Sequence, residues 1–324
     1  MSLLRWGIVI AGSAPFVVMA VVAARWGEPG SDEVVAANQV LPAVTSPGVV
    51  HTVRRPPAAP AEPCSKADCQ TVADALEKRV DGALRLIVRP PFVIAGDLPA
   101  TELERWHAGT IQPAAAAMDH CYFDAPPSAP ITVLLFSGQE SYDQYARRLF
   151  ADEGISVYGY YRPTERTLVM NIGTGGGTLV HELTHALIDF DFPAVPEWFN
   201  EGLASLHEQC RFRESADGPW IEGLPNWRLA ALQEAIEQGR LGSLEQLATT
   251  SDFRGPQEAL NYAQARYLCL YLQERGLLKK FYRALREHRE SDPRGAKTLA
   301  ALFAGKEWGE VDAQFQAWVK ALRP

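Results

Sequence analysis

The sequence has no concentration of positive charge, and this absence argues against one broad class of function. Its 324 residues include 31 Lys and Arg against 39 Asp and Glu, which gives a formal net charge of −8. The basic pair Arg54–Arg55 is too short to form a surface that binds a phosphate backbone. We therefore expect no nucleic-acid partner, and a chain of this length suits one large domain or two smaller ones.

Cysteine is also scarce, with five in the chain. Cys64 and Cys69 lack the second cysteine pair that a structural zinc site of this kind needs. They could close a short disulfide loop, and Cys121 and Cys210 a longer one, in an oxidising compartment. Spacing alone does not fix such pairings. Cys269 lies in an apolar helical pattern and is expected to be a buried thiol.

One segment has no charge at all. The nineteen residues from Trp6 to Ala24 are uncharged, just enough for a helix to span a bilayer. Residues 1–27 are therefore either a signal peptide, with small residues before a cleavage point near Ala24, or a membrane anchor. The length favours the anchor. Either way the rest of the chain is expected outside the cytoplasm, tethered to the membrane by this helix, or secreted if residues 1–24 are cleaved.

The remaining chain divides into a linker and a folded domain. Residues 28–63 are rich in Pro and Ala and are expected to form an extended tether. Residues 64–324 read as an α+β domain that becomes all-helical from about residue 196. The patterns predict helices over 68–84 and 137–154, a helix starting at Thr101 and interrupted at Pro113, strands over 84–97 and Ile131–Phe136, and a hairpin over 157–173. Further helices are expected over 196–210, 224–240, 261–276, 277–291 and 311–324.

The segment TLVHELTHAL, residues 178–187, carries the strongest chemical signal. His181 and His185 are four residues apart, so a helix places both on one face, where they can bind one ion. Glu182 projects to the side and can reach a water on that ion. Such a match also arises by chance, so the interpretation depends on a third ligand, which catalytic zinc sites normally have.

Three acidic residues downstream are candidates for that ligand. Asp191 would require a sharp turn after the helix, usually made at a glycine, but Ile188 stands at that position. Glu197 and Glu201, in PEWFNEGLAS, lie one helical turn apart and can share a face. Glu197 also suits the first turn of a helix for reasons of charge alone. Spacing does not choose between these two.

The two motifs together, HELTHAL and PEWFNEGLASL, resemble those of the gluzincin metallopeptidases in the peptidase MA-like group. The resemblance covers about residues 131–321. It implies a thermolysin-like zincin core and one Zn²⁺ held by His181, His185 and Glu201. It further implies Glu182 as the general base, and a tyrosine or histidine that stabilises the oxyanion, for which Tyr262 is the candidate. Tyr262 would equally suit a core position at a helix boundary.

The resemblance is incomplete around the histidines. Related enzymes often carry an acidic residue that supports a zinc-binding histidine, and Ser205 stands at the corresponding turn, with Asp189 as an alternative supporter. Four histidines of the folded domain lie outside the motif, lack ligand-like spacing and are expected on the surface or on helix faces. They are His107, His120, His207 and His288.

The combined prediction is an exported zinc metallopeptidase that acts on a peptide or protein substrate. The hairpin over 157–173 could bind an extended substrate at its edge, or be an ordinary core hairpin with aromatic cross-strand pairs. Two alternatives remain: a catalytically silent zinc-binding scaffold of the cell envelope, and a tethered interaction module in which the motif is fortuitous. The sequence does not distinguish endopeptidase from aminopeptidase action and gives no oligomeric state.

Overall fold

The computed structural model describes residues 17–21, 37–41, 62–80, 82–303 and 305–323. The chain divides into two units, residues 1–45 and 46–324. In the first, β1 (Val17–Val21) pairs antiparallel with β2 (Ala37–Leu41). Most of the expected targeting helix and linker lies outside the described residues. Within the described residues, no helix is both long and apolar enough to cross a membrane.

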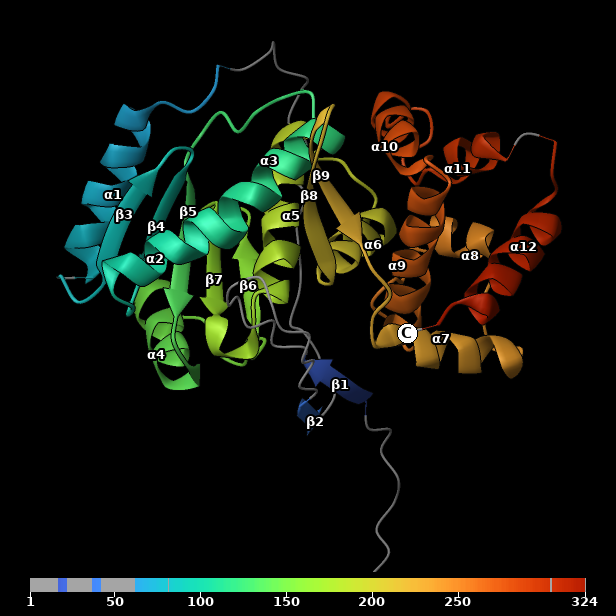
Figure 1. Ribbon diagram of the computed structural model, residues 1–324, viewed down its shortest axis with the longest axis horizontal. Helices are drawn as coiled ribbons and strands as arrows, with labels where there is room; N and C mark the ends of the chain where they lie inside the picture. The colour runs from blue at the N-terminus through green and yellow to red at the C-terminus, as the bar shows by residue number, and fades with distance from the viewer. Residues whose placement is uncertain (1–16, 22–36, 42–61, 81, 304, 324) are drawn as a thin grey trace, which may run out of the picture. The chain divides into compact units, whose positions relative to one another are not determined.

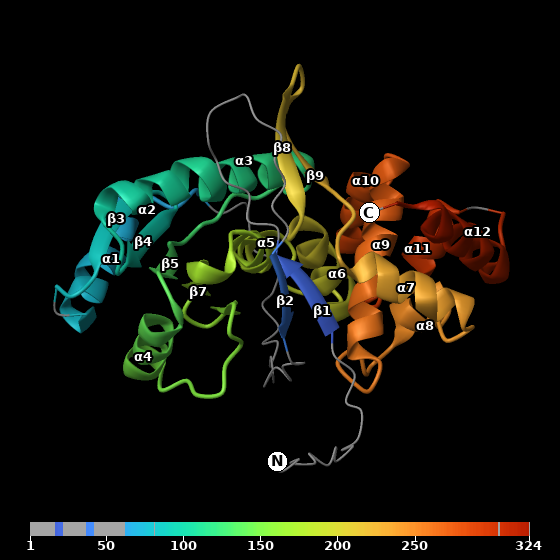
Figure 2. The same cartoon turned by 60° about the horizontal axis from the view of Figure 1, so that its bottom comes forward.

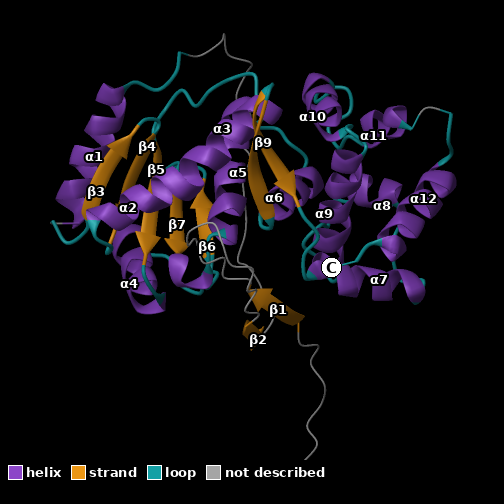
Figure 3. Ribbon diagram, in the orientation of Figure 1, coloured by secondary structure: helices purple, strands orange, loops and turns teal. Residues whose placement is uncertain are grey.

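A five-stranded mixed sheet forms the first part of the second unit (Figures 1 and 3). Its strands, in spatial order, are β3 (Arg85–Arg89), β4 (Phe92–Gly96), β5 (Ile131–Phe136), β7 (Thr167–Asn171) and β6 (Gly159–Arg162). The three inner strands are parallel, and the two outer strands join them antiparallel. The predicted strand over 131–136 and the hairpin over 157–173 are thereby confirmed, and β6 is an edge strand.

Helices cover both faces of this sheet. They are α1 (Lys66–Val80) and α4 (Gln139–Phe150) on one face, and α2 (Ala100–Trp106), α3 (Gln112–Cys121) and α5 (Gly177–Asp191) on the other. Side chains alternate along a strand, so Val133 packs with the second group and Leu134 with the first. Both residues are fully buried, as expected for parallel strands between two helical layers.

Several local predictions differ from the structure. The segment 84–97 forms two strands, because Pro90 and Pro91 make a turn at its centre. The helix predicted to start at Thr101 begins at Ala100, and Pro99 is its N-cap. Pro113 does not interrupt the helix, because a π-helical turn, His107–Ile111, precedes it and leaves Pro113 in the first turn of α3, where no N–H is needed.

The region after α5 is mostly helical, as predicted, but it contains three unpredicted elements. Its helices are α6 (Glu197–His207), α7 (Arg228–Glu237), α8 (Leu244–Thr249), α9 (Glu258–Glu274), α10 (Leu278–Glu287), α11 (Ala296–Leu302) and α12 (Trp308–Ala321). Helices α8 and α11 were not expected. Nor was the hairpin of β8 (Cys210–Ser215) and β9 (Gly218–Gly223), which stands beside α3 in Figures 1 and 2.

Close helix packing positions α6. A Cβ on Gly202 would lie 2.9 Å from the carbonyl oxygen of Ala265 on α9, so only glycine allows this approach. At the other side, a Cβ on Gly177, the first residue of α5, would lie 2.5 Å from the carbonyl oxygen of Glu208. The two glycines therefore hold α6 against both α5 and α9.

The cysteines are all free thiols. The Sγ atoms of Cys64 and Cys69 lie 3.4 Å apart, and burial, followed by the contact with Cys69, raises the pKa of Cys64 to about 12. Cys269 is fully buried on α9, as the sequence predicts.

Candidate metal centre

Helices α5 and α6 bring three side chains with metal-ligating atoms to one point. The Nε2 atoms of His181 and His185 lie 3.1 Å apart. The Oε2 atom of Glu201 lies 3.4 Å from the first and 3.6 Å from the second. One donor atom from each of the three residues lies within 4.8 Å of the others, a group that could hold one metal ion. All three side chains are buried or nearly so.

Each histidine is oriented through its other ring nitrogen. His181 Nδ1 lies 3.1 Å from Glu208 Oε1, and His185 Nδ1 lies 2.9 Å from Asn200 Oδ1. His181 precedes His185 in the chain, whereas its partner Glu208 follows Asn200, the partner of His185. Helices α5 and α6 are therefore antiparallel. Partners of this type fix ring orientation and tautomer in histidine metal sites.

These contacts define which atoms face the centre. The Asn200 oxygen only accepts hydrogen bonds, so a neutral His185 ring carries its hydrogen on Nδ1. His181 Nδ1 meets the Glu208 carboxylate as a close charged contact without hydrogen-bond geometry. With the hydrogen on Nδ1 of each ring, the two Nε2 lone pairs and Glu201 Oε2 face one another. Three acceptors converging in a buried site without a donor repel one another, and a cation between them removes that conflict. The donor set, two imidazoles and a carboxylate, suits Zn²⁺.

Without a cation, a proton takes this role. Burial disfavours the charged His181 ring, but the Glu201 and Glu208 carboxylates outweigh burial and raise its pKa to about 10. Burial likewise opposes ionisation of Glu201, and the two histidines overcome it and hold its pKa well below the usual range. The pKa of Glu208 falls to about 2, because Arg228 and His181 outweigh its burial. The site therefore stabilises one positive charge that is surrounded by the carboxylates of Glu201 and Glu208.

The structure separates the three candidates for a third ligand. Glu197 lies away from the histidines, with its side chain half exposed and its Oε1 atom accepting a hydrogen bond from Arg254 at 2.8 Å. Asp191 is buried at the end of α5, where it accepts hydrogen bonds from Arg286 and from Tyr282 at 2.8 Å. Glu201 alone of the three joins the histidines.

Glu182 lies beside the centre on α5 and is partly exposed. Among the described residues, no hydrogen bond or ion pair engages its carboxylate. Its charge acts on the ring of His181 and on Tyr142, and in both cases it contributes to raising the pKa. A carboxylate next to the histidines that has no hydrogen bond or ion pair among the described residues can exchange protons with a water.

Tyr262 reaches the centre from α9. Its hydroxyl makes a hydrogen bond with Glu201, and burial followed by the charge of Glu201 raises its pKa far above the usual range. The ring lies 5.1 Å from that of Phe253. Tyr262 therefore stays protonated and is held beside the third ligand.

Several residues that shape the centre were missed from the sequence. Asn200 lies inside the NEG motif without an assigned role, and Glu208 follows Glu201 by two helical turns, a spacing that could have identified it. Arg254 lies in a loop and carries no sequence signal. The Ser205 hydroxyl has no hydrogen-bond partner among the described residues, and the carboxylate of Asp189 lies 3.4 Å from the Tyr161 hydroxyl. The carboxylate that lies against His181 Nδ1 is that of Glu208.

The expectation for His207 is wrong. It is fully buried, with Nδ1 3.2 Å from Thr184 Oγ1 and Nε2 3.4 Å from the hydroxyl of Tyr122. Burial, followed by the charge of Arg266, lowers its pKa to about 3. His207 is thus a neutral core residue beneath the metal centre.

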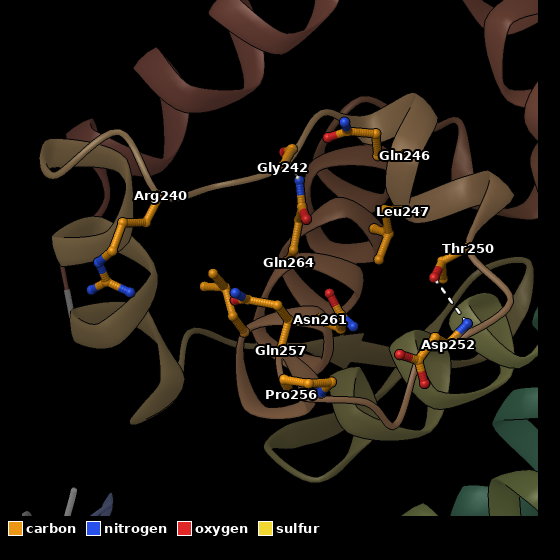
Figure 4. Close-up of a pocket in the computed structure, with 11 residues that line it drawn as sticks. Arg240, Gly242, Gln246, Leu247, Thr250, Asp252, Pro256, Gln257, Asn261 and Gln264 are labelled. Atoms are coloured by element: carbon orange, nitrogen blue, oxygen red, sulfur yellow. Dashed lines mark hydrogen bonds between the residues drawn. The ribbon is translucent and has the colours of Figure 1, made fainter.

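A separate cavity lies in the helical region. Its volume is about 350 Å³, and polar side chains such as Arg240, Asp252 and Gln264 line it together with apolar ones such as Leu247 and Leu260 (Figure 4). It contains none of the histidine ligands. Asp252 and Pro256 line it from the same loop that carries Arg254.

Comparisons with known proteins assign no function to the chain, so a functional assignment depends on the geometry of the site. No protein-family model matches the chain, and no curated protein matches it.

Proposed function

We propose that the protein is a zinc-dependent peptidase of the gluzincin type with a zincin-like core. The observation that carries this proposal is the convergence of His181, His185 and Glu201 from two adjacent helices, with an oxygen of Glu208 or Asn200 beside the second nitrogen of each histidine. A pure binding site has no use for an unpaired carboxylate at Glu182. Such a carboxylate beside the ligands is what hydrolysis requires.

The residues have separate roles in this scheme. Zinc bound to such ligands supplies Lewis acidity, which lowers the pKa of a bound water to about 7 and polarises a carbonyl oxygen. Glu182 takes a proton from the attacking water, whose oxygen bonds to the peptide carbonyl carbon. Glu182 then delivers the proton to the amine nitrogen as the C–N bond breaks. Tyr262 exchanges its hydrogen bond with Glu201 for one to the developing oxyanion.

The edge strand β6 offers a place for an extended substrate. It lies beside α5, and its outer edge has no partner strand within the described residues. An extended peptide could add to this edge through backbone hydrogen bonds and lead its chain toward α5. The uncharged run from Trp6 to Ala24 supports export of the protein, as a membrane-tethered or secreted form.

Metal analysis and a peptide-library digest of the purified protein test this function. The wild type is expected to hold one Zn²⁺ and to cleave, and Glu182→Gln to keep the ion while losing roughly 10²- to 10⁴-fold in rate. Glu77→Gln, the same change at an exposed position of α1 on the other face of the sheet, is the matched control and should cleave normally. Full activity of Glu182→Gln would reject the mechanism. Stoichiometric zinc without any cleavage would instead favour a binding scaffold.

A further inference from the structure

The two oxygens of the Glu201 carboxylate have different partners. Oε2 faces the histidines. Oε1 faces the other way and accepts a hydrogen bond from Arg254 Nη2 at 2.6 Å. A charge-assisted bond of this length fixes both the position and the rotation of a carboxylate.

Arg254 is itself held in place. Its Nε atom donates to Glu197 at 2.8 Å, and its Nη1 atom lies 3.7 Å from Glu258. The guanidinium carbon lies 5.8 Å from the centre of the Tyr262 ring, a distance at which a cation and an aromatic face attract. The rigid fork of arginine therefore links the metal centre to two further carboxylates.

The loop that carries Arg254 is also anchored. Phe253 is buried, and its carbonyl oxygen accepts a hydrogen bond from Asn261 of α9 at 2.8 Å. The side chain of Arg254 is one-third exposed, so its removal leaves no large void. The contacts of Arg254 position Glu201 and contribute little to the packing of the core.

We propose that Arg254 is a positioning residue that makes Glu201 a one-oxygen metal ligand. The proposal rests on the proposed function, since it requires that an ion bind here. Zinc accepts a carboxylate through either one or two oxygens, and the second oxygen would take a coordination position that water or substrate needs. Because Arg254 occupies Oε1, only Oε2 remains for the ion.

Metal binding to the full chain, independent of hydrolysis, tests this role. Zn²⁺ affinity is measured by competition with a chromophoric chelator, and coordination number by the visible absorption of the Co²⁺-substituted protein. Arg254→Met is expected to lower Zn²⁺ affinity roughly 10- to 100-fold, the usual effect of losing a residue that orients a ligand. Its Co²⁺ band should weaken, as it does when a four-coordinate ion gains a fifth ligand. Arg254→Lys should restore the band in part, since a single ammonium still engages Oε1.

Control variants distinguish a loss of the Arg254 contact from a failure to fold and from a failure of the proposed function. Arg213→Met, on the exposed β8–β9 hairpin, should leave both measurements unchanged, and Glu197→Gln should change them less than Arg254→Met. If Arg254→Met does not fold, Arg254→Gln gives the same comparison. Wild-type affinity and spectrum in the variant that folds would overturn the role of Arg254 alone. A wild type that binds no zinc would reject the proposed function itself.

Discussion

The sheet region and the helical region contribute to the metal centre in different ways. The sheet region, through α5, supplies His181, Glu182 and His185 on one rigid helix that packs on the sheet. The helical region supplies Glu201 and the groups around it that carry most of the charge, among them Glu208, Arg228 and Arg254. The sheet region provides the histidine ligands, and the helical region provides most of the charged groups around them. Substitutions in the two regions should therefore have different effects on metal binding.

The largest expected effect comes from the sheet region. His185→Ala removes a ligand while Glu201 and Arg254 stay in place, so stoichiometric zinc binding should disappear. The loss of affinity should exceed the roughly 10- to 100-fold typical of a supporting residue. Isothermal titration with Zn²⁺ measures it. Retained stoichiometric binding would show that His185 is not required to hold the ion.

A smaller loss is expected from the supporting residues of the helical region. Glu208→Gln should lower Zn²⁺ affinity by roughly 10- to 100-fold, and Asn200→Ala by less, because a carboxylate increases the basicity of its histidine more than an amide does. Competition titrations on both variants compare them directly. Equal losses would mean that orientation, and not charge, determines the support.

Packing within the helical region, between α6 and α9, can be disturbed without touching a ligand. Gly202→Ala places a methyl group against the backbone of Ala265, and we expect a loss of about 1–3 kcal/mol in the free energy of unfolding. Chemical denaturation of the metal-free protein measures this loss. Gly109→Ala, at a helical position with open space around the added Cβ, is the control and should not destabilise the protein in this way.

A smaller effect is expected on the pH dependence of the free energy of unfolding. The folded pKa of His207, about 3, lies below the ordinary value of 6.5, so between these values the unfolded chain binds a proton that the folded protein does not. Stability from this residue is complete above about pH 6.5 and is lost as the pH falls toward 3. The slope is at most about 1.4 kcal/mol per pH unit. His207→Gln should flatten the stability profile between about pH 4 and 6. An unchanged profile would contradict the burial of a neutral ring.

Metal binding should also strengthen as the pH rises, for a different reason. In the metal-free protein the pKa of His181 is raised to about 10, so the ion must displace a proton from the site at neutral pH. Apparent Zn²⁺ affinity should therefore rise as the pH rises from about 6 to 9. Proton release on binding, measured in buffers of different ionisation enthalpy, checks this expectation.

The sequence predicted the parts of the molecule that depend on periodicity and on short motifs. Strand Ile131–Phe136 and the α5 motif are such cases, because apolar runs and the spacing of histidines translate directly into local structure. The choice of Glu201 over Glu197 needed the resemblance, since both share a helix face. Arg254 could not be predicted, because its partner is 53 positions away in the chain and only tertiary packing brings the two together. The β8–β9 hairpin was missed because β8 is short and largely exposed, and glycine and proline interrupt the apolar pattern of β9.

The contiguity of the ligands has a consequence for how the site is assembled. The three candidate ligands and both histidine partners lie within residues 177–208, and they meet through a single turn between α5 and α6. Contacts this local form early, while those of Arg254 and Tyr262 must await the folding of α9. An ion that binds here would thus be captured by a nascent helical pair before Arg254 fixes the position of its ligand carboxylate.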